Sequence, residues 1–208
     1  MFFSFDGVDG AGKSTQMRLF CDWLREAGHE VVECRDPGST RLGEAIRAIL
    51  LEHSDTPIHR RSEMLLYMAA RAQLVEEVIR PQLEAGRTVV SDRFLLANVV
   101  YQGYAGGLDI ESVWQVGGIA TSGIRPDRTF VLDLDSATAT QRIRRAHDRM
   151  EAQGPDFQQR VREGFLCEAA RHPERISVID ASRDVAAIQS DIREAARPHL
   201  AESHIPQP

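Results

Sequence analysis

Residues 7–14 read Gly7-Val8-Asp9-Gly10-Ala11-Gly12-Lys13-Ser14 and match G-x-x-x-x-G-K-[ST], the phosphate-binding loop or P-loop, at every specified position. The run Phe2-Phe3-Ser4-Phe5 precedes this loop and is typical of a buried strand. Apolar residues recur at helical spacing after it, from Met17 to Leu24. In this context main-chain N–H groups and the positive end of the helix dipole converge on phosphate oxygens. We therefore expect Lys13 to reach the terminal phosphates of a nucleotide and the Ser14 hydroxyl to ligate Mg²⁺.

Lys13 is the only lysine in the chain. The sequence has 25 Lys and Arg residues, and all the others are arginine. The two side chains are not interchangeable, because lysine presents a compact ammonium and arginine a planar fork. A sequence that uses arginine elsewhere and lysine here favours a phosphate-binding role over a chance glycine-rich turn.

Composition bounds the class of protein. A chain of 208 residues is long enough for one well-buried domain, and 42% apolar residues is ordinary for a globular protein. The net charge of −6 excludes a basic surface for non-specific nucleic-acid binding. We expect neither a membrane span nor a leader, because no apolar run approaches about 20 residues and the chain opens directly on a strand. Cys21, Cys34 and Cys167 are odd in number and widely spaced, which argues against zinc or disulfides and fits a reducing cytoplasm.

Strand and helix patterns alternate along the chain. We expect strands at residues 2–5, 30–34, 88–90, 128–134 and 176–179. We expect helices after the P-loop and at residues 40–52, 61–83, 110–121, 137–149, 157–171 and 185–197, with a glycine-rich bend at 103–107 and a frayed tail after Pro198. This alternation predicts a five-stranded parallel sheet with helices on both faces. Ligands bind such sheets at the carboxyl ends of the strands, where the P-loop, Arg35–Thr40 and Asp92–Arg93 would all lie.

Asp92 and Arg93 follow a strand directly. In P-loop enzymes a carboxylate at this place holds Mg²⁺ or its waters, whereas an isolated Asp would more often cap a turn. Beside a P-loop we favour the metal role for Asp92. The Arg93 guanidinium would face the same cavity, where bidentate binding of a phosphate suits it better than a surface ion pair.

Four arginines cluster before the break at Gly154-Pro155: Arg142, Arg144, Arg145 and Arg149. They could form a solvated helix face. They could also belong to a mobile lid, over about residues 142–155, that closes on the phosphates. Phosphoryl transfer requires positive charge on the oxygens of the moving group and the exclusion of water, and a lid arginine supplies both.

The sequence excludes several classes of P-loop protein. A GTPase needs an Asn-Lys-x-Asp motif, but Asn98 is the only asparagine and the only lysine lies in the P-loop. An ATPase motor is normally larger or carries a coupled domain. No Ser-His-Asp or Cys-His pattern indicates a protein nucleophile. A small-molecule kinase remains.

The chain resembles the thymidylate kinase family from Phe5 to about Arg197. The similar segments are Phe5–Thr15, which has Asp6 where Glu is usual; Arg35-Asp36-Pro37-Gly38-Ser39-Thr40; Leu65–Arg71, with Tyr67 where Phe is usual; Asp92-Arg93-Phe94 through Asn98 to Tyr101-Gln102-Gly103, with Ala97 where Ser is common; and Asp148-Arg149-Met150-Glu151. The resemblance implies a P-loop NTPase fold of three α/β/α layers with a short lid. It also implies the transfer of phosphate from ATP to dTMP, with Mg²⁺, in a homodimer.

The resemblance also implies site residues, position by position. Gly7, Val8, Asp9, Gly10, Ala11, Gly12, Lys13, Ser14 and Thr15 would bind ATP, and Ser14 and Asp92 the metal. For dTMP, Tyr67 would stack on the base, Arg71 would hydrogen-bond the base and Asn98 would bind its polar edge. Tyr101 would lie near the sugar, and Gln102 would also belong to the dTMP site. Asp9 would meet the 3′-hydroxyl, and Arg35 and Arg93 the 5′-phosphate. Lys13, Arg93, Arg145 and Arg149 would be catalytic. The two lid arginines, Arg145 and Arg149, are included because Gly10 stands where one form of the family has a P-loop arginine.

Four alternatives stay open on the residues alone. Tyr67 could be ordinary core on an amphipathic helix, and the apolar face of Leu65–Val78 could serve the core or a dimer. The acceptor could be another nucleoside monophosphate or a small alcohol. The chain could also be a nucleotide-binding regulator without transfer activity. The adenine contacts are expected near Asp180–Arg183, after the last strand.

Overall fold

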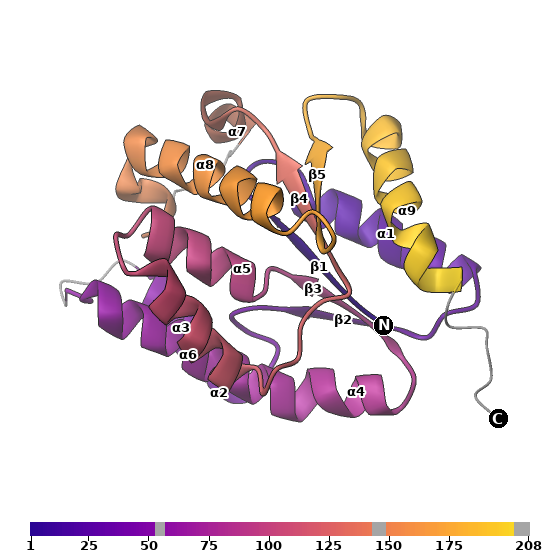
Figure 1. Cartoon of the computed structure of the whole chain (residues 1–208), viewed down its shortest axis with the longest axis horizontal. Coiled ribbons are helices and arrows are strands. Elements are labelled where there is room, and N and C mark those ends of the chain that lie inside the picture. Colours follow the sequence, from indigo (N-terminus) through magenta and orange to yellow (C-terminus); the bar gives the residue numbers. More distant parts are fainter. Residues whose placement is uncertain (53–56, 143–148, 202–208) are drawn as a thin grey trace.

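The computed structural model describes residues 1–52, 57–142 and 149–201. Its five strands are β1 (Phe2–Gly7), β2 (Val31–Arg35), β3 (Thr88–Asp92), β4 (Arg128–Asp133) and β5 (Ile176–Asp180). They form one parallel sheet in the order β2-β3-β1-β4-β5, which confirms the predicted fold class. Helices cover both faces: α1 (Lys13–Glu26) and α9 (Val185–Ala201) pack together on one, and α5 (Leu95–Asn98), α6 (Ile110–Ala120) and α8 (Pro155–Arg171) lie on the other (Figure 1).

The central strand is buried because its aromatic residues fill the core. All six residues of β1 are buried. The Phe5 ring lies 5.6 Å from Phe20 of α1 and 5.1 Å from Phe130 of β4, centroid to centroid. The aromatic run read as a strand therefore anchors α1, and with it the P-loop, to the middle of the sheet.

The long helix expected over residues 61–83 is continuous in the structure but not regular. It consists of α3 (Arg60–Leu74), a π-helical turn (Val75–Ile79) and α4 (Arg80–Glu84). Pro81 follows the π turn, and proline lacks an N–H and crowds the preceding turn, so a wider turn accommodates it. The helix α2 (Arg41–Leu51) begins at the Thr40 cap, whose side chain accepts from the Gly43 N–H at 2.9 Å, and packs against α3.

One helical segment has no counterpart in the sequence prediction. The chain forms α5 and then a π-helical turn over Val99–Tyr104, so the bend expected at 103–107 begins two residues late. Every residue from Leu95 to Gly103 is buried. A helix that is buried on all sides has no solvent-facing polar stripe and so lacks the amphipathic periodicity of a surface helix, which is why the pattern missed it.

Three further boundaries differ. The helix α7 spans Ser136–Arg142, residues 143–148 of the expected helix lie outside the described ranges, and Arg149 is in a turn. The helix α8 begins at Pro155, because proline is well suited to the first helical position and not only to a break. The helix α9 continues through Pro198 to Ala201, because a proline in the last turn removes few hydrogen bonds. Residues 202–208 of the expected tail lie outside the described ranges. Within the described ranges, no helix is both long and apolar enough to cross a bilayer.

Candidate active site

The P-loop connects β1 to α1 through three glycines with positive φ. A Cβ at Gly7 would lie 2.5 Å from the Leu132 carbonyl oxygen, and one at Gly10 would lie 2.1 Å from the Ala139 carbonyl oxygen. Gly12 has φ +95° and precedes the first residue of α1. The first turn of α1, all of it described, has no acidic residue, so its positive dipole end stays available to an anion.

Lys13 lies along the inside of this loop. Its ammonium donates to the carbonyl oxygens of Gly7 at 3.1 Å and Val8 at 2.9 Å, and pairs with Asp9 Oδ1 at 3.3 Å. The side chain is 7% exposed, and burial, helped by Arg93, lowers its pKa. The sole lysine is therefore fixed beside the loop amides, while Ser14 and Thr15 of the same turn are exposed.

Arg93 connects the P-loop to the segment after β3. Its guanidinium donates to Gly7 O at 3.0 Å, to Asp9 Oδ1 at 2.6 Å and to the Tyr101 hydroxyl at 3.2 Å, and lies 5.1 Å from the Tyr101 ring centroid. Burial alone would raise the pKa of Asp9, but Arg93 and Lys13 outweigh burial and hold that pKa well below its usual range. Asp9 is thus a fixed negative charge between two cations.

Two carboxylates at the ends of β1 and β3 lack partners. Neither oxygen of buried Asp6, nor Oδ1 of Asp92, has a hydrogen-bond partner among the described residues. Burial raises the pKa of Asp6 from 3.8 to about 7, and Asp92 adds to the rise against the opposing effect of Arg93 and Lys13. No cluster of three or more His, Cys, Asp or Glu with metal-binding geometry occurs in the described ranges. Mg²⁺ commonly uses one or two carboxylates with substrate phosphates and water, and the orphaned Asp92 oxygen fits that donor set.

Asp6→Asn is expected to flatten the pH dependence of stability. The pKa of Asp6 is higher in the folded state than in the unfolded state. The contribution of Asp6 to stability is therefore fully present below about pH 4 and is lost as the pH rises through about 7. The fall is at most about 4 kcal/mol for a shift of this size. Urea unfolding from pH 4 to 8, without nucleotide, measures it. If the free energy of unfolding depended on pH equally in Asp6→Asn and in the parent chain, the raised pKa of Asp6 would be wrong. The control is Asp22→Asn, which changes an exposed acid on α1.

A cavity of about 100 Å³ beside the P-loop brings together seven of the predicted acceptor-site residues. These are Asp9, Tyr67, Arg71, Arg93, Asn98, Tyr101 and Gln102. Arg35, the eighth, does not line this cavity: its side chain is half exposed and pairs with Glu44 at 2.7 Å. The structure thus unites P-loop, α3 and α5 residues in one pocket and leaves Arg35 at its margin.

Arg71 organises the polar contacts in the wall of this cavity. It is fully buried, and its Nε donates to Asp36 Oδ2 at 2.5 Å, Nη1 to Asn98 Oδ1 at 2.9 Å and Nη2 to the Phe94 carbonyl at 3.3 Å. Burial raises the pKa of Asp36 against the opposing effect of Arg71. The sequence prediction did not assign Asp36 a role, because a loop aspartate gives no sign of being buried.

A polar chain extends from Arg71 towards the end of the expected lid. Asn98 Nδ2 donates to Gln102 Oε1 at 2.5 Å, and Gln102 Nε2 donates to Glu63 Oε1 at 3.0 Å. Glu63 is fully buried and forms an ion pair with Arg149 at 2.6 Å. The sequence prediction also missed Glu63, since a helical Glu usually faces solvent.

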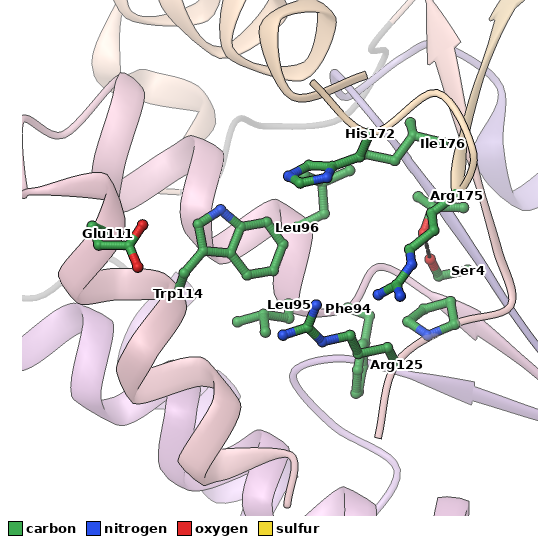
Figure 2. Close-up of a pocket in the computed structure, with 12 residues that line it drawn as sticks. Ser4, Phe94, Leu95, Leu96, Glu111, Trp114, Arg125, His172, Arg175 and Ile176 are labelled. Carbon is green, nitrogen blue, oxygen red and sulfur yellow. Dashed lines mark hydrogen bonds between the residues drawn. The ribbon is translucent and has the colours of Figure 1, made fainter. Parts of the chain in front are cut away.

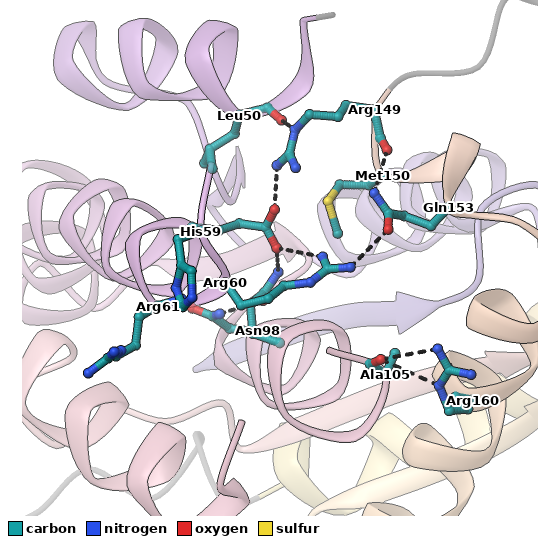
Figure 3. Close-up of polar contacts among 12 residues, drawn as sticks. Leu50, His59, Arg60, Arg61, Asn98, Ala105, Arg149, Met150, Gln153 and Arg160 are labelled. Atoms are coloured by element: carbon teal, nitrogen blue, oxygen red, sulfur yellow. Dashed lines mark hydrogen bonds and ion pairs between the residues drawn. The ribbon is translucent and has the colours of Figure 1, made fainter. Parts of the chain in front are cut away.

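The structure describes two of the four clustered arginines, Arg142 and Arg149. Arg149 Nε donates to the Leu50 carbonyl at 2.7 Å, so its guanidinium is held by α2 and by Glu63 of α3 (Figure 3). Arg142 donates to the Ala181 carbonyl at 3.5 Å, near the expected adenine contacts. Arg144 and Arg145 lie outside the described residues.

Comparison with known proteins agrees with this geometry. A family model described as thymidylate kinase matches residues 5–192. A thymidylate kinase of Rhodopirellula baltica is 45% identical over 91% of this chain and 77% of its own length, and one of Symbiobacterium thermophilum is 46% identical over 93% and 91%. The crystal structure of thymidylate kinase from Ehrlichia chaffeensis superposes with a TM-score of 0.76 at 30% identity, covering 94% of this chain and 97% of that one. The chain therefore belongs to the thymidylate kinase family.

Proposed function

We propose that this protein transfers the γ-phosphoryl group of ATP to dTMP and releases ADP and dTDP. The observation that carries the proposal is the cavity that joins the P-loop residues Asp9 and Arg93 to Arg71, Asn98 and Tyr67. Such a cavity suits a nucleoside monophosphate whose phosphate faces the P-loop and whose base faces α3. Membership of the thymidylate kinase family and the presence of a P-loop support ATP as the phosphoryl donor.

The base end of the cavity offers specific recognition at low conformational cost. Arg71 is fixed by Asp36 and Asn98, so its orientation does not have to be established on binding. The Tyr67 ring, which also lines the cavity, would stack on thymine. We assign Tyr101, held by Arg93 and Asp9, to the sugar, and Asp9 to its 3′-hydroxyl.

The phosphate end concentrates positive charge. Lys13 and the loop amides would bind the β- and γ-phosphates of ATP, and Arg93 the acceptor phosphate. Ser14 and Asp92 would hold Mg²⁺, which when bound neutralises charge on the phosphates. We assign the lid to about residues 142–155, within a single domain, with Arg145 and Arg149 as its candidate catalytic groups. Arg149 would leave Glu63 to reach a phosphoryl group.

The exposed apolar residues support a homodimer. Leu65 of α3 is 52% exposed and Ile119 of α6 is 81% exposed, although α3 and α6 contact each other within the chain. A second copy would remove these side chains from water.

A panel of acceptors tests the proposed function. With Mg²⁺ and ATP, dTMP is expected to give the highest kcat/KM among dTMP, dUMP, dCMP and dGMP. The advantage over dUMP should be modest, about 10- to 200-fold, because one methyl group contributes only about 1–3 kcal/mol. EDTA should abolish turnover on every acceptor. A higher kcat/KM on another monophosphate would indicate a different kinase, and binding of both nucleotides without turnover would indicate a regulator.

A further inference from the structure

A second cavity, of about 260 Å³, lies on the other side of α5 from the acceptor cavity. Its lining includes Phe94, Leu95, Trp114, Arg125, His172 and Arg175 (Figure 2). These residues come from α5 and the residue before it, from α6, and from the loops that precede β4 and β5. None of the residues assigned above to ATP, dTMP or Mg²⁺ lines it, so the proposed reaction does not account for it.

The cavity has an aromatic and apolar side. Phe94 and Leu95 are buried and form part of the lining (Figure 2). The Trp114 indole faces the same space, and its Nε1 donates to Glu168 Oε2 at 3.2 Å, which fixes the ring. A flat ring could lie against Trp114 and Leu95 without reorganising the wall.

The opposite side of the cavity is cationic. The guanidinium groups of Arg125 and Arg175 project into the hollow from two different loops (Figure 2). The Arg125 side chain forms no hydrogen bond or ion pair with any residue in the described ranges, and the Arg175 side chain pairs there only with Glu174, at 3.9 Å. The acidic residue of the lining, Glu111, lies beyond Trp114 from both arginines (Figure 2). Two convergent guanidinium groups without a carboxylate between them suit a bound anion.

The two cavities share a wall. Phe94 lines the second cavity, yet its carbonyl accepts from Arg71 Nη2 at 3.3 Å and its ring centroid lies 5.6 Å from the Arg71 guanidinium carbon. Ala97 and Asn98, one helical turn further, line the acceptor cavity. Movement of Phe94 would therefore displace the buried arginine assigned to the thymine base.

We propose that this cavity binds a small aromatic anion and thereby changes the affinity of the acceptor site. The ring would lie against Trp114 and Leu95, with its carboxylate, sulfonate or phosphate between Arg125 and Arg175. Coupling would pass through Phe94–Asn98 to Arg71. The binding half of this proposal does not depend on the acceptor being dTMP.

Fluorescence titration with 8-anilinonaphthalene-1-sulfonate, an aromatic anion, tests binding in the absence of nucleotide. The chain has two tryptophans, so Trp23→Phe leaves Trp114 as the only reporter. We expect the probe to quench Trp114. Charge reversal by Arg125→Glu or Arg175→Glu should weaken probe binding at least about tenfold, because it removes a charge-assisted contact and adds repulsion. Arg61→Glu, an equal charge change at an exposed site on α3 outside the cavity, is the matched control.

Measurement of dTMP affinity with and without saturating probe tests the coupling. We expect a change of about fivefold or more, and dTMP must change the probe affinity by the same factor, because coupling between two sites is reciprocal. Arg125→Glu should keep the basal turnover. Equal probe affinity in the Arg125→Glu and Arg61→Glu chains, or unchanged Trp114 emission, would overturn the site. Unchanged dTMP affinity would overturn the coupling, and turnover failure in the parent chain would count only against the proposed function.

Discussion

Lys13→Ala is expected to lower kcat for phosphoryl transfer by about 10³-fold or more while the protein stays folded. Removal of one preorganised charge-stabilising donor commonly costs roughly 10²–10³ in rate, and this ammonium is the single lysine of the chain. Its present partners are two loop carbonyls and Asp9, and Asp9 keeps Arg93 at 2.6 Å after the change. The loss should therefore appear in chemistry and in ATP binding, not in the fold.

A coupled assay for ADP release and a thermal melt together measure this effect. Lys13→Arg should also be strongly impaired, since a guanidinium keeps the charge but not the compact shape beside the loop carbonyls. Arg25→Ala removes a cation from the same helix at an exposed ion pair with Glu33 and should leave kcat unchanged. If Lys13→Ala kept kcat within tenfold of the parent, the P-loop assignment would be wrong.

Arg71→Ala is expected to raise KM for dTMP by about 10²-fold and to change KM for ATP by less than about threefold. Hydrogen bonds to a charged group are worth about 1.5–3 kcal/mol each, and Arg71 lines the acceptor cavity together with two of its partners, Asp36 and Asn98. The change should also destabilise the fold by roughly 3–5 kcal/mol, because it leaves the Asp36 carboxylate buried without its partner.

The double variant Arg71→Ala, Asp36→Asn separates binding from stability. Asparagine removes the buried charge and should recover part of the free energy of unfolding, whereas KM for dTMP should stay high. Steady-state kinetics and urea unfolding on the same preparations provide both quantities. Equal increases in KM for ATP and dTMP would contradict the base-binding role, and full recovery of dTMP use in the double variant would show that Arg71 acts only through stability.

The sheet and the P-loop could be predicted because their signals are local. The alternation of strands and helices predicts the fold class, which the structure confirms, and residues 7–14 form the predicted loop between β1 and α1. The acceptor residues Tyr67, Arg71 and Asn98 came from a family resemblance, and the structure places them in one cavity. That arrangement depends on how α3 and α5 meet, which no local pattern records.

The buried acids show what the sequence could not indicate. Asp36 reads as a turn residue and Glu63 as a helix-surface residue, but both side chains are fully buried against arginines. A carboxylate is buried only where a cation and donors from distant segments meet it, so its role depends on tertiary structure. The same holds for Arg149, which reads as a free lid residue yet contacts Glu63 and the Leu50 carbonyl.

The burial of Lys13 has a practical consequence for handling the protein. Residues 1–208 contain one lysine, so a reagent that acylates amines has a single side-chain target within them, the Lys13 ammonium. Lys13 is 7% exposed, which shields it in the native state. Acylation of this side chain would then require the P-loop to open, so the rate of acylation would report that opening.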